Sequence, residues 1–147
     1  MAFDSYRELI HELASFPPQL SAAVANAGEP PEGEWSAAQI LAHLAAIEEF
    51  WLERLNLMLN QREPLLRSFG EAATQRAEEL VKDSIQENIT RFSETRGQIV
   101  SALMSMTLND WERTGTHETR GEITITDLVE TIADHDAEHL EQLESYA

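Results

Sequence analysis

The sequence has no cysteine, a single lysine and no long apolar run. The absence of cysteine excludes disulfides, thiolate nucleophiles and cysteine-ligated zinc or iron–sulfur centres, so any metal would be bound by His, Asp or Glu. Its 10 Lys and Arg stand against 27 Asp and Glu, which gives a formal charge of −17. Nucleic acids and anionic membranes are bound through clustered cations, so we expect neither as a partner.

The longest uncharged segment lies between Glu12 and Glu29, and it contains Pro17 and Pro18. This segment is shorter than the roughly 20 apolar residues that a membrane-spanning helix needs. No basic, apolar leader is recognisable either, so we expect a soluble, cytoplasmic protein. A chain of this length buries about 68–70% of its unfolded surface, which is enough for one domain over residues 1–147.

Apolar residues recur at helical spacing over four segments, and no alternating strand pattern of convincing length is present. Three of these segments begin with a capping box, a Ser followed three residues later by Glu or Gln, at Ser5, Ser36 and Ser84. The fourth segment begins near Thr124 with a similar box. The sequence therefore predicts an all-α protein, a four-helix bundle.

Two long connections, residues 60–83 and 107–123, separate these helices. The first contains a short predicted helix around Glu71 to Leu80, whereas the second shows little periodicity. Connections longer than about 12–15 residues are uncommon in compact domains and are often functional. We therefore expect a bundle with long crossover connections, the second of which lines a site.

Three of the five histidines fall on the apolar faces of predicted helices. His135 and His139 are one turn apart on the fourth helix, and His43 occupies the inward face of the second. Three imidazoles on one divalent ion leave a coordination position open, as in catalytic zinc sites, and nickel, iron or manganese also fits such a site. The alternative is that each histidine is a separate, hydrogen-bonded core residue.

Three charged residues, Glu48, Arg96 and Asp136, also fall on inward faces. A lone buried charge is costly, so these side chains should have partners. Either a carboxylate orients one of the ligating imidazoles, or the three form a structural ion pair that gives packing specificity. Asp136 is less favoured as a direct fourth ligand, because the side chains of adjacent helical residues diverge.

Two further histidine motifs are discounted. His135–His139 matches the His-x-x-Glu-His pattern of inverted zinc peptidases, but only a short tail follows it and Glu138 belongs to the polar face. A di-iron bundle would need inward Glu-x-x-His motifs on two helices, and Glu8–His11 faces outward. His117 is either an exposed polar loop residue, which is the favoured interpretation, or part of a pocket.

Several motifs occur in an order and spacing that carry a further interpretation: Trp35-Ser36, His43-Leu44, Glu48, Trp51, Trp111-Glu112-Arg113, Gly115-Thr116-His117, Gly121-Glu122-Ile123-Thr124, His135-Asp136 and His139-Leu140. In these motifs the sequence resembles the DinB/YfiT-like family of small bacterial four-helix bundles, over nearly its whole length. The resemblance implies a metal role for His43, His135 and His139. It also implies a bound divalent ion, nickel or zinc foremost, and a homodimer.

Some members of the wider superfamily are thiol-dependent S-transferases or isomerases, in which the metal activates a low-molecular-weight thiol such as mycothiol or bacillithiol. The resemblance thus implies a metal-dependent S-transferase or hydrolase that acts on a small electrophile. The alternative is a non-catalytic, dimeric, stress-associated bundle with a structural or vestigial metal site. No cationic cluster is evident that would hold the carboxylates of a thiol cofactor, which leaves Arg113 and Arg120 in the second long connection as candidates.

Overall fold

The computed structural model describes residues 2–147, with side chains from residue 6 onward. Four long helices form a bundle: α1 (Ala2–Asn26), α2 (Ala37–Asn60), α4 (Ile85–Met104) and α5 (Ile125–Glu144). The shorter elements are β1 (Leu65–Leu66), α3 (Gly70–Leu80), the 3₁₀ helix η1 (Leu108–Glu112), β2 (Thr114–His117) and β3 (Gly121–Thr124). The predicted four-helix bundle is confirmed, with a small sheet added to it.

Three of the four long helices begin where local capping predicts. Ser36, Ser84 and Thr124 each accept the backbone N–H three residues later, and that later side chain accepts the N–H of the cap. Each box satisfies two backbone donors that have no partner within the helix. These starts depend only on residues close in the sequence, which is why the sequence locates them.

The predicted start of the first helix is wrong. Helix α1 begins at Ala2, so Ser5 lies within the helix, and the side chain of Ser5 lies outside the described set. Pro17 and Pro18 do not end this helix, which continues to Asn26.

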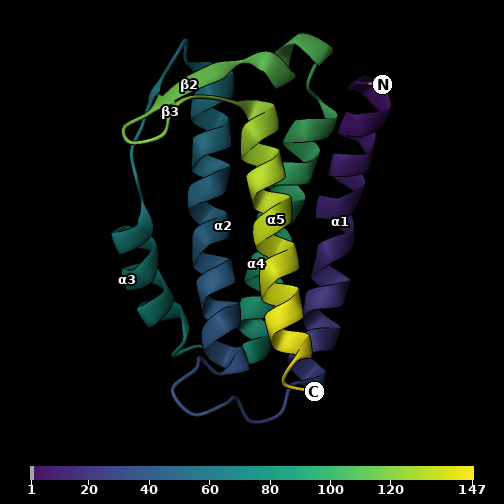
Figure 1. The fold of residues 1–147 in the computed structure, drawn as a ribbon, viewed down its shortest axis with the longest axis vertical. Helices are drawn as coiled ribbons and strands as arrows, with labels where there is room; N and C mark the ends of the chain where they lie inside the picture. Colours follow the sequence, from purple (N-terminus) through teal and green to yellow (C-terminus); the bar gives the residue numbers. More distant parts are fainter. Residues whose placement is uncertain (1) are drawn as a thin grey trace.

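The helices pack in an order that differs from their order in the chain. Helix α1 packs against α4 and α5, and α2 packs against α3, α4 and α5. Figure 1 shows α1 and α5 running in one direction and α2 and α4 in the other, so the connection from α2 to α4 crosses the length of the bundle. That connection carries β1 and α3, and α3 covers the outside of α2.

A three-stranded sheet, in the order β1-β2-β3, lies across the end of the bundle where α2 ends and α5 begins (Figure 1). Strands β2 and β3 form an antiparallel hairpin, and β1 pairs with β2 in parallel. Gly121 closes the hairpin turn with φ of 78°, a conformation that glycine adopts without steric cost. These strands were not predicted from the sequence, because strands of two to four residues are too short to show an alternating pattern.

The core divides into two apolar clusters along the bundle. One surrounds Trp51 and Trp111 near the sheet, and the other surrounds Phe92 and Tyr146 near the opposite end. Between the clusters lies a layer of polar side chains: Glu48 and His43 on α2, Arg96 on α4, and His135, Asp136 and His139 on α5. Among the described residues, no helix is both long enough and apolar enough to cross a membrane.

Candidate metal centre

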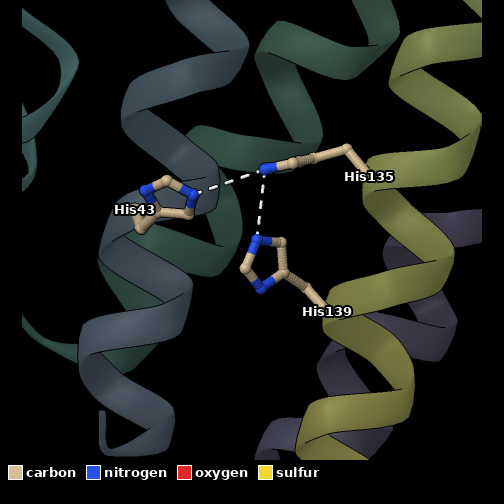
Figure 2. Close-up of side chains that lie close together, drawn as sticks. All are labelled: His43, His135 and His139. Carbon is tan, nitrogen blue, oxygen red and sulfur yellow. Dashed lines mark hydrogen bonds between the residues drawn. The ribbon is translucent and has the colours of Figure 1, made fainter. Parts of the chain in front are cut away.

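His43 from α2 meets His135 and His139 from α5, and the three rings point toward one another (Figure 2). The Nε2 atom of His135 lies 3.4 Å from Nε2 of His43 and 3.1 Å from Nε2 of His139. The three candidate ligand atoms lie within 4.8 Å of one another, and each side chain is half-buried. The structure therefore brings together the three histidines that the sequence singled out.

The spacing of these nitrogens fits a small divalent ion. Zinc–nitrogen bonds of about 2.0–2.1 Å in a tetrahedral arrangement separate neighbouring ligand nitrogens by about 3.3 Å. The two Nε2 separations at His135 are close to that value. Imidazole donors suit zinc, nickel, iron and copper, whereas magnesium and calcium prefer oxygen. Three imidazoles also leave room in the coordination shell for a further ligand.

Two of the three imidazoles, those of His43 and His135, are held in the neutral form that a metal requires. Burial, followed by repulsion from His139, lowers the pKa of His43 to about 4. Burial, followed by repulsion from His139, His43 and Arg96, lowers the pKa of His135 to about 3. Both rings are therefore unprotonated at neutral pH, with a lone pair to offer.

These lowered pKa values predict that the metal-free protein loses stability as the pH falls from 6.5 toward 4. In that window the unfolded chain binds protons that the folded chain does not, so the contribution of His135 is complete above pH 6.5 and shrinks below it. Because the ring is partly exposed, we expect His135→Asn to reduce the loss by about 1 kcal/mol. Urea unfolding with chelator at pH 7.5 and 4.5 measures this difference. Identical losses in the wild type and the variant would refute it, and His11→Asn on the exposed face of α1 is the control.

A chain of hydrogen bonds fixes the ring of His139. Its Nδ1 lies 3.0 Å from Oε1 of Gln142, whose Nε2 donates to the Tyr146 hydroxyl at 3.4 Å. That hydroxyl donates in turn to the carbonyl oxygen of Trp35 at 2.8 Å. Because an amide oxygen only accepts, Nδ1 of His139 donates the hydrogen in this contact, and Nε2 is the ring nitrogen that faces the site. Sequence reasoning missed Gln142, although its position one turn after His139 was the available signal.

Replacing Gln142 with leucine should weaken metal binding by about 10–100-fold, the range typical for loss of a partner that orients a ligating histidine. The fold should survive, because Leu143 and the rest of the apolar face of α5 are unchanged. Competition with a chromogenic chelator measures the affinity. Gln86→Leu, on the exposed face of α4, is the matched control. Equal affinities in the two variants would contradict an orienting role for Gln142.

Two tryptophans border the site. The Trp51 ring meets His135 edge to face, with centroids 4.9 Å apart, and is buried. Trp35 meets His43 in the same manner at 5.1 Å, and 47% of Trp35 is exposed. The first tryptophan closes the site toward the core, whereas the second covers His43 from the solvent side.

Arg96, Glu48 and Asp136 form a buried ionic cluster beside the histidines. Arg96 donates through Nε and Nη2 to Glu48, through Nη1 and Nη2 to Asp136, and through Nη1 to the Leu13 carbonyl. All five guanidinium hydrogens are thus used. Burial raises the pKa of both carboxyl groups, against the opposing attraction of Arg96.

The contacts of Arg96 with Glu48 and Asp136 agree with the interpretation of these three residues as a structural ion pair. Burial disfavours the Arg96 cation, but attraction to Glu48 and Asp136 outweighs it and raises the pKa of Arg96. The interpretation that one of these carboxylates orients an imidazole is wrong for His135. Its Nδ1 is buried and has no hydrogen-bond partner among the described residues, because Arg96 engages the carboxylate oxygens on this level of the bundle.

Comparisons with known proteins identify the family of this chain. The family profile described as DinB superfamily matches residues 5–143. The chain belongs to the DinB superfamily. None of the curated proteins compared with it matches.

A solved structure shares the fold of this DinB-superfamily protein. It is described as "YfiT from Bacillus subtilis is a probable metal-dependent hydrolase with an unusual four-helix bundle topology". The two chains are 21% identical, the TM-score is 0.86, and the match covers 97% of this chain and 86% of the other. At this identity the likeness establishes the fold.

His117 does not occupy the exposed loop position that we favoured for it. It ends strand β2 and is buried, because the strand turns its side chain inward. Its Nδ1 accepts hydrogen bonds from the backbone N–H groups of Thr119 and Arg120, each at 3.2 Å. The ring therefore also stabilises the hairpin turn. Burial, followed by repulsion from Arg54 and Arg120, lowers the pKa of His117.

The other residues that the sequence analysis considered, Arg113, Arg120 and His11, lie in different places in this DinB-superfamily fold. Arg120 lines a cavity at the sheet end of the bundle. Arg113 instead donates to the carbonyls of Met58 at 2.8 Å and Gln61 at 3.4 Å, so it caps the end of α2. His11 is exposed, as expected, and its Nε2 lies 3.4 Å from Oγ of Ser15.

Proposed function

We propose that this DinB-superfamily protein is a metal-dependent enzyme that adds a nucleophile to a small electrophile, with hydrolysis as the leading reaction. The observation that carries the proposal is the convergence of three imidazoles from two helices at one half-buried point. The description of the Bacillus subtilis YfiT structure as a probable metal-dependent hydrolase supports the same reaction class.

In this proposal His43, His135 and His139 hold one divalent ion, with nickel or zinc as the leading candidates. Such an ion supplies Lewis acidity and makes a water or thiol nucleophilic near neutral pH. Gln142 keeps the proton of His139 on Nδ1, so the opposite nitrogen faces the ion. Trp51 shields the inner side of the site from water.

A cobalt-substituted protein tests whether the site is open to exogenous ligands. We expect the visible spectrum of the cobalt site to change on addition of azide or 2-mercaptoethanol, because an open position accepts them. With the native metal identified by elemental analysis of untagged protein, hydrolysis of a panel of small activated esters should stop on chelation and return when that metal is restored. A spectrum that no added ligand alters would overturn the enzymatic proposal.

The thiol-transfer variant of this proposal makes a distinct prediction. A thiol nucleophile should perturb the cobalt spectrum at lower concentration than azide does, and transfer should require both thiol and metal. In the non-catalytic alternative the metal is structural, so chelation lowers the melting temperature substantially while thiols bind equally to the loaded and metal-free protein. Self-association as a homodimer and a cytoplasmic location stay predictions, and sedimentation velocity tests the first.

A further inference from the structure

A cavity of about 240 Å³ lies between α2, the start of α3, the β2–β3 hairpin and the first turns of α5. Its lining includes Trp51, Arg54, Gly70, His117, Arg120 and Thr131. The volume equals that of roughly eight water molecules in the liquid and is below the range of about 300–1,000 Å³ typical of drug-sized ligands. The cavity therefore suits a small ligand.

Two arginines in the lining lack the acidic partners that other arginines of this chain have. Arg76, Arg91 and Arg96 form salt bridges with carboxylates. Within the described part of the chain, no salt bridge joins Arg54 or Arg120 to an acid.

The buried Arg54 is held in place by uncharged groups. Its Nη2 donates to the Arg67 carbonyl at 2.6 Å, and the guanidinium lies 4.6 Å from the centre of the Phe69 ring. Burial, together with repulsion from Arg120, lowers the pKa of Arg54. Two cations that line one cavity would be stabilised by an anion bound between them.

His117 adds a neutral donor to the same cavity. Because its Nδ1 accepts two backbone N–H groups, the hydrogen of the neutral ring is on Nε2. Nε2 makes no hydrogen bond within the described protein and is not sealed from solvent, since the only fully buried side-chain atom without a partner there is Nδ1 of His135. The ring therefore offers an N–H to a ligand in the cavity.

The acid in the lining, Asp127, forms no salt bridge with Arg54 or Arg120 within the described part of the chain. Asp127 accepts the backbone N–H of Thr124 at 2.8 Å as part of the α5 cap. Helix α3 begins beside the cavity at Gly70, and its N-cap residue Phe69 makes no side-chain capping bond. The free N–H groups of that first turn favour negative charge.

The cavity adjoins the three-histidine site. Trp51 lines the cavity and also contacts the ring of His135. Thr131, another lining residue, lies one helical turn before His135 on α5. The cavity and the three-histidine site therefore share the Trp51 ring as a common wall.

We propose that Arg54, Arg120 and His117 form an oxyanion subsite that binds the carboxylate or phosphate group of a small substrate. The link between this subsite and a reaction at the histidines rests on the proposed function, whereas anion binding itself does not. The substrate class is a small molecule that carries one of these anionic groups. Neutral apolar electrophiles would leave both arginines unpaired.

Titration calorimetry on chelator-treated, metal-free protein tests the subsite with two probes, inorganic phosphate and malonate. We expect one or both to bind, and the comparison shows which oxyanion is preferred. Arg120→Gln should weaken binding by about tenfold, as expected for loss of one charge-assisted hydrogen bond. Arg120 is exposed, so this variant should fold normally. Arg62→Gln, which removes the same charge from an exposed position outside the cavity lining, should bind like the wild type.

His117→Asn provides a second variant: its side-chain oxygen can still accept the N–H groups of the hairpin turn in place of Nδ1, whereas the Nε2 donor is lost, so it should also weaken binding. The proposal is overturned if neither probe binds, or if Arg62→Gln and Arg120→Gln weaken binding equally. Metal analysis of the same proteins separates the two proposals. Anion binding without metal uptake would contradict the proposed enzymatic function but not the anion subsite. Metal uptake without anion binding would contradict the anion subsite but not the enzymatic function.

Discussion

Replacing Arg96 with leucine is expected to lower the free energy of unfolding by about 3–5 kcal/mol, because it leaves two carboxylates buried without a cation. Glu48 and Asp136 are 0% and 5% exposed, so water cannot replace the lost bonds without opening the bundle. The guanidinium also lies over the Phe16 and Phe92 rings, at 5.5 and 4.9 Å from their centroids, and leucine keeps only part of that packing. Urea unfolding monitored by circular dichroism measures the change, and the melting temperature should fall by about 10 °C or more.

The matched control is Arg76→Leu, which removes a surface ion pair with Glu49. Pairs of that kind contribute about 0–1 kcal/mol, so the control should remain close to the wild type. In the double variant Arg96→Leu/Glu48→Leu the loss should be smaller than the sum of the single losses, because one stranded charge is removed with the arginine. An Arg96→Leu protein as stable as Arg76→Leu would show that the ionic cluster does not hold the bundle together.

Substitution of either His43 or His139 by alanine should abolish stoichiometric metal binding. Each change removes a direct ligand, and loss of a partner that merely orients a ligand already costs about 10–100-fold in affinity. The two residues come from different helices, so concordant losses would locate the ion between α2 and α5. Elemental analysis of untagged protein, together with competitive titration by zinc and nickel, gives the stoichiometry and the affinity.

His11→Ala is the control for this pair, because His11 lies on the exposed face of α1. It should keep the metal content and affinity of the wild type. Both site variants should stay folded, since their side chains are only half-buried and alanine favours a helix. Full metal content in both variants would exclude the three-histidine site.

The three histidines of the candidate metal site could be predicted from the sequence, whereas the roles of Gln142 and His117 could not. The helical repeat placed His43, His135 and His139 on inward faces, since facing requires only the position of a residue in its own helix. Gln142 was missed because its role depends on Tyr146 reaching the Trp35 carbonyl, a contact between residues 111 positions apart. His117 was misjudged because a four-residue strand in a glycine-containing connection carries too little pattern to reveal which side is buried.

The sequence by itself determined the start of three bundle helices and the face of each histidine, because capping and helical periodicity act between residues within a few positions. Tertiary structure decided which charged groups meet. From the sequence alone, Arg96 could pair with Glu48, with Asp136 or with neither. It pairs with both because α4 packs against α1 and α2, and α5 packs against the same two helices. Tertiary structure likewise brought Arg54 from α2 beside Arg120 of the hairpin. Such encounters depend on helix order and crossing, which arise from packing over the whole core.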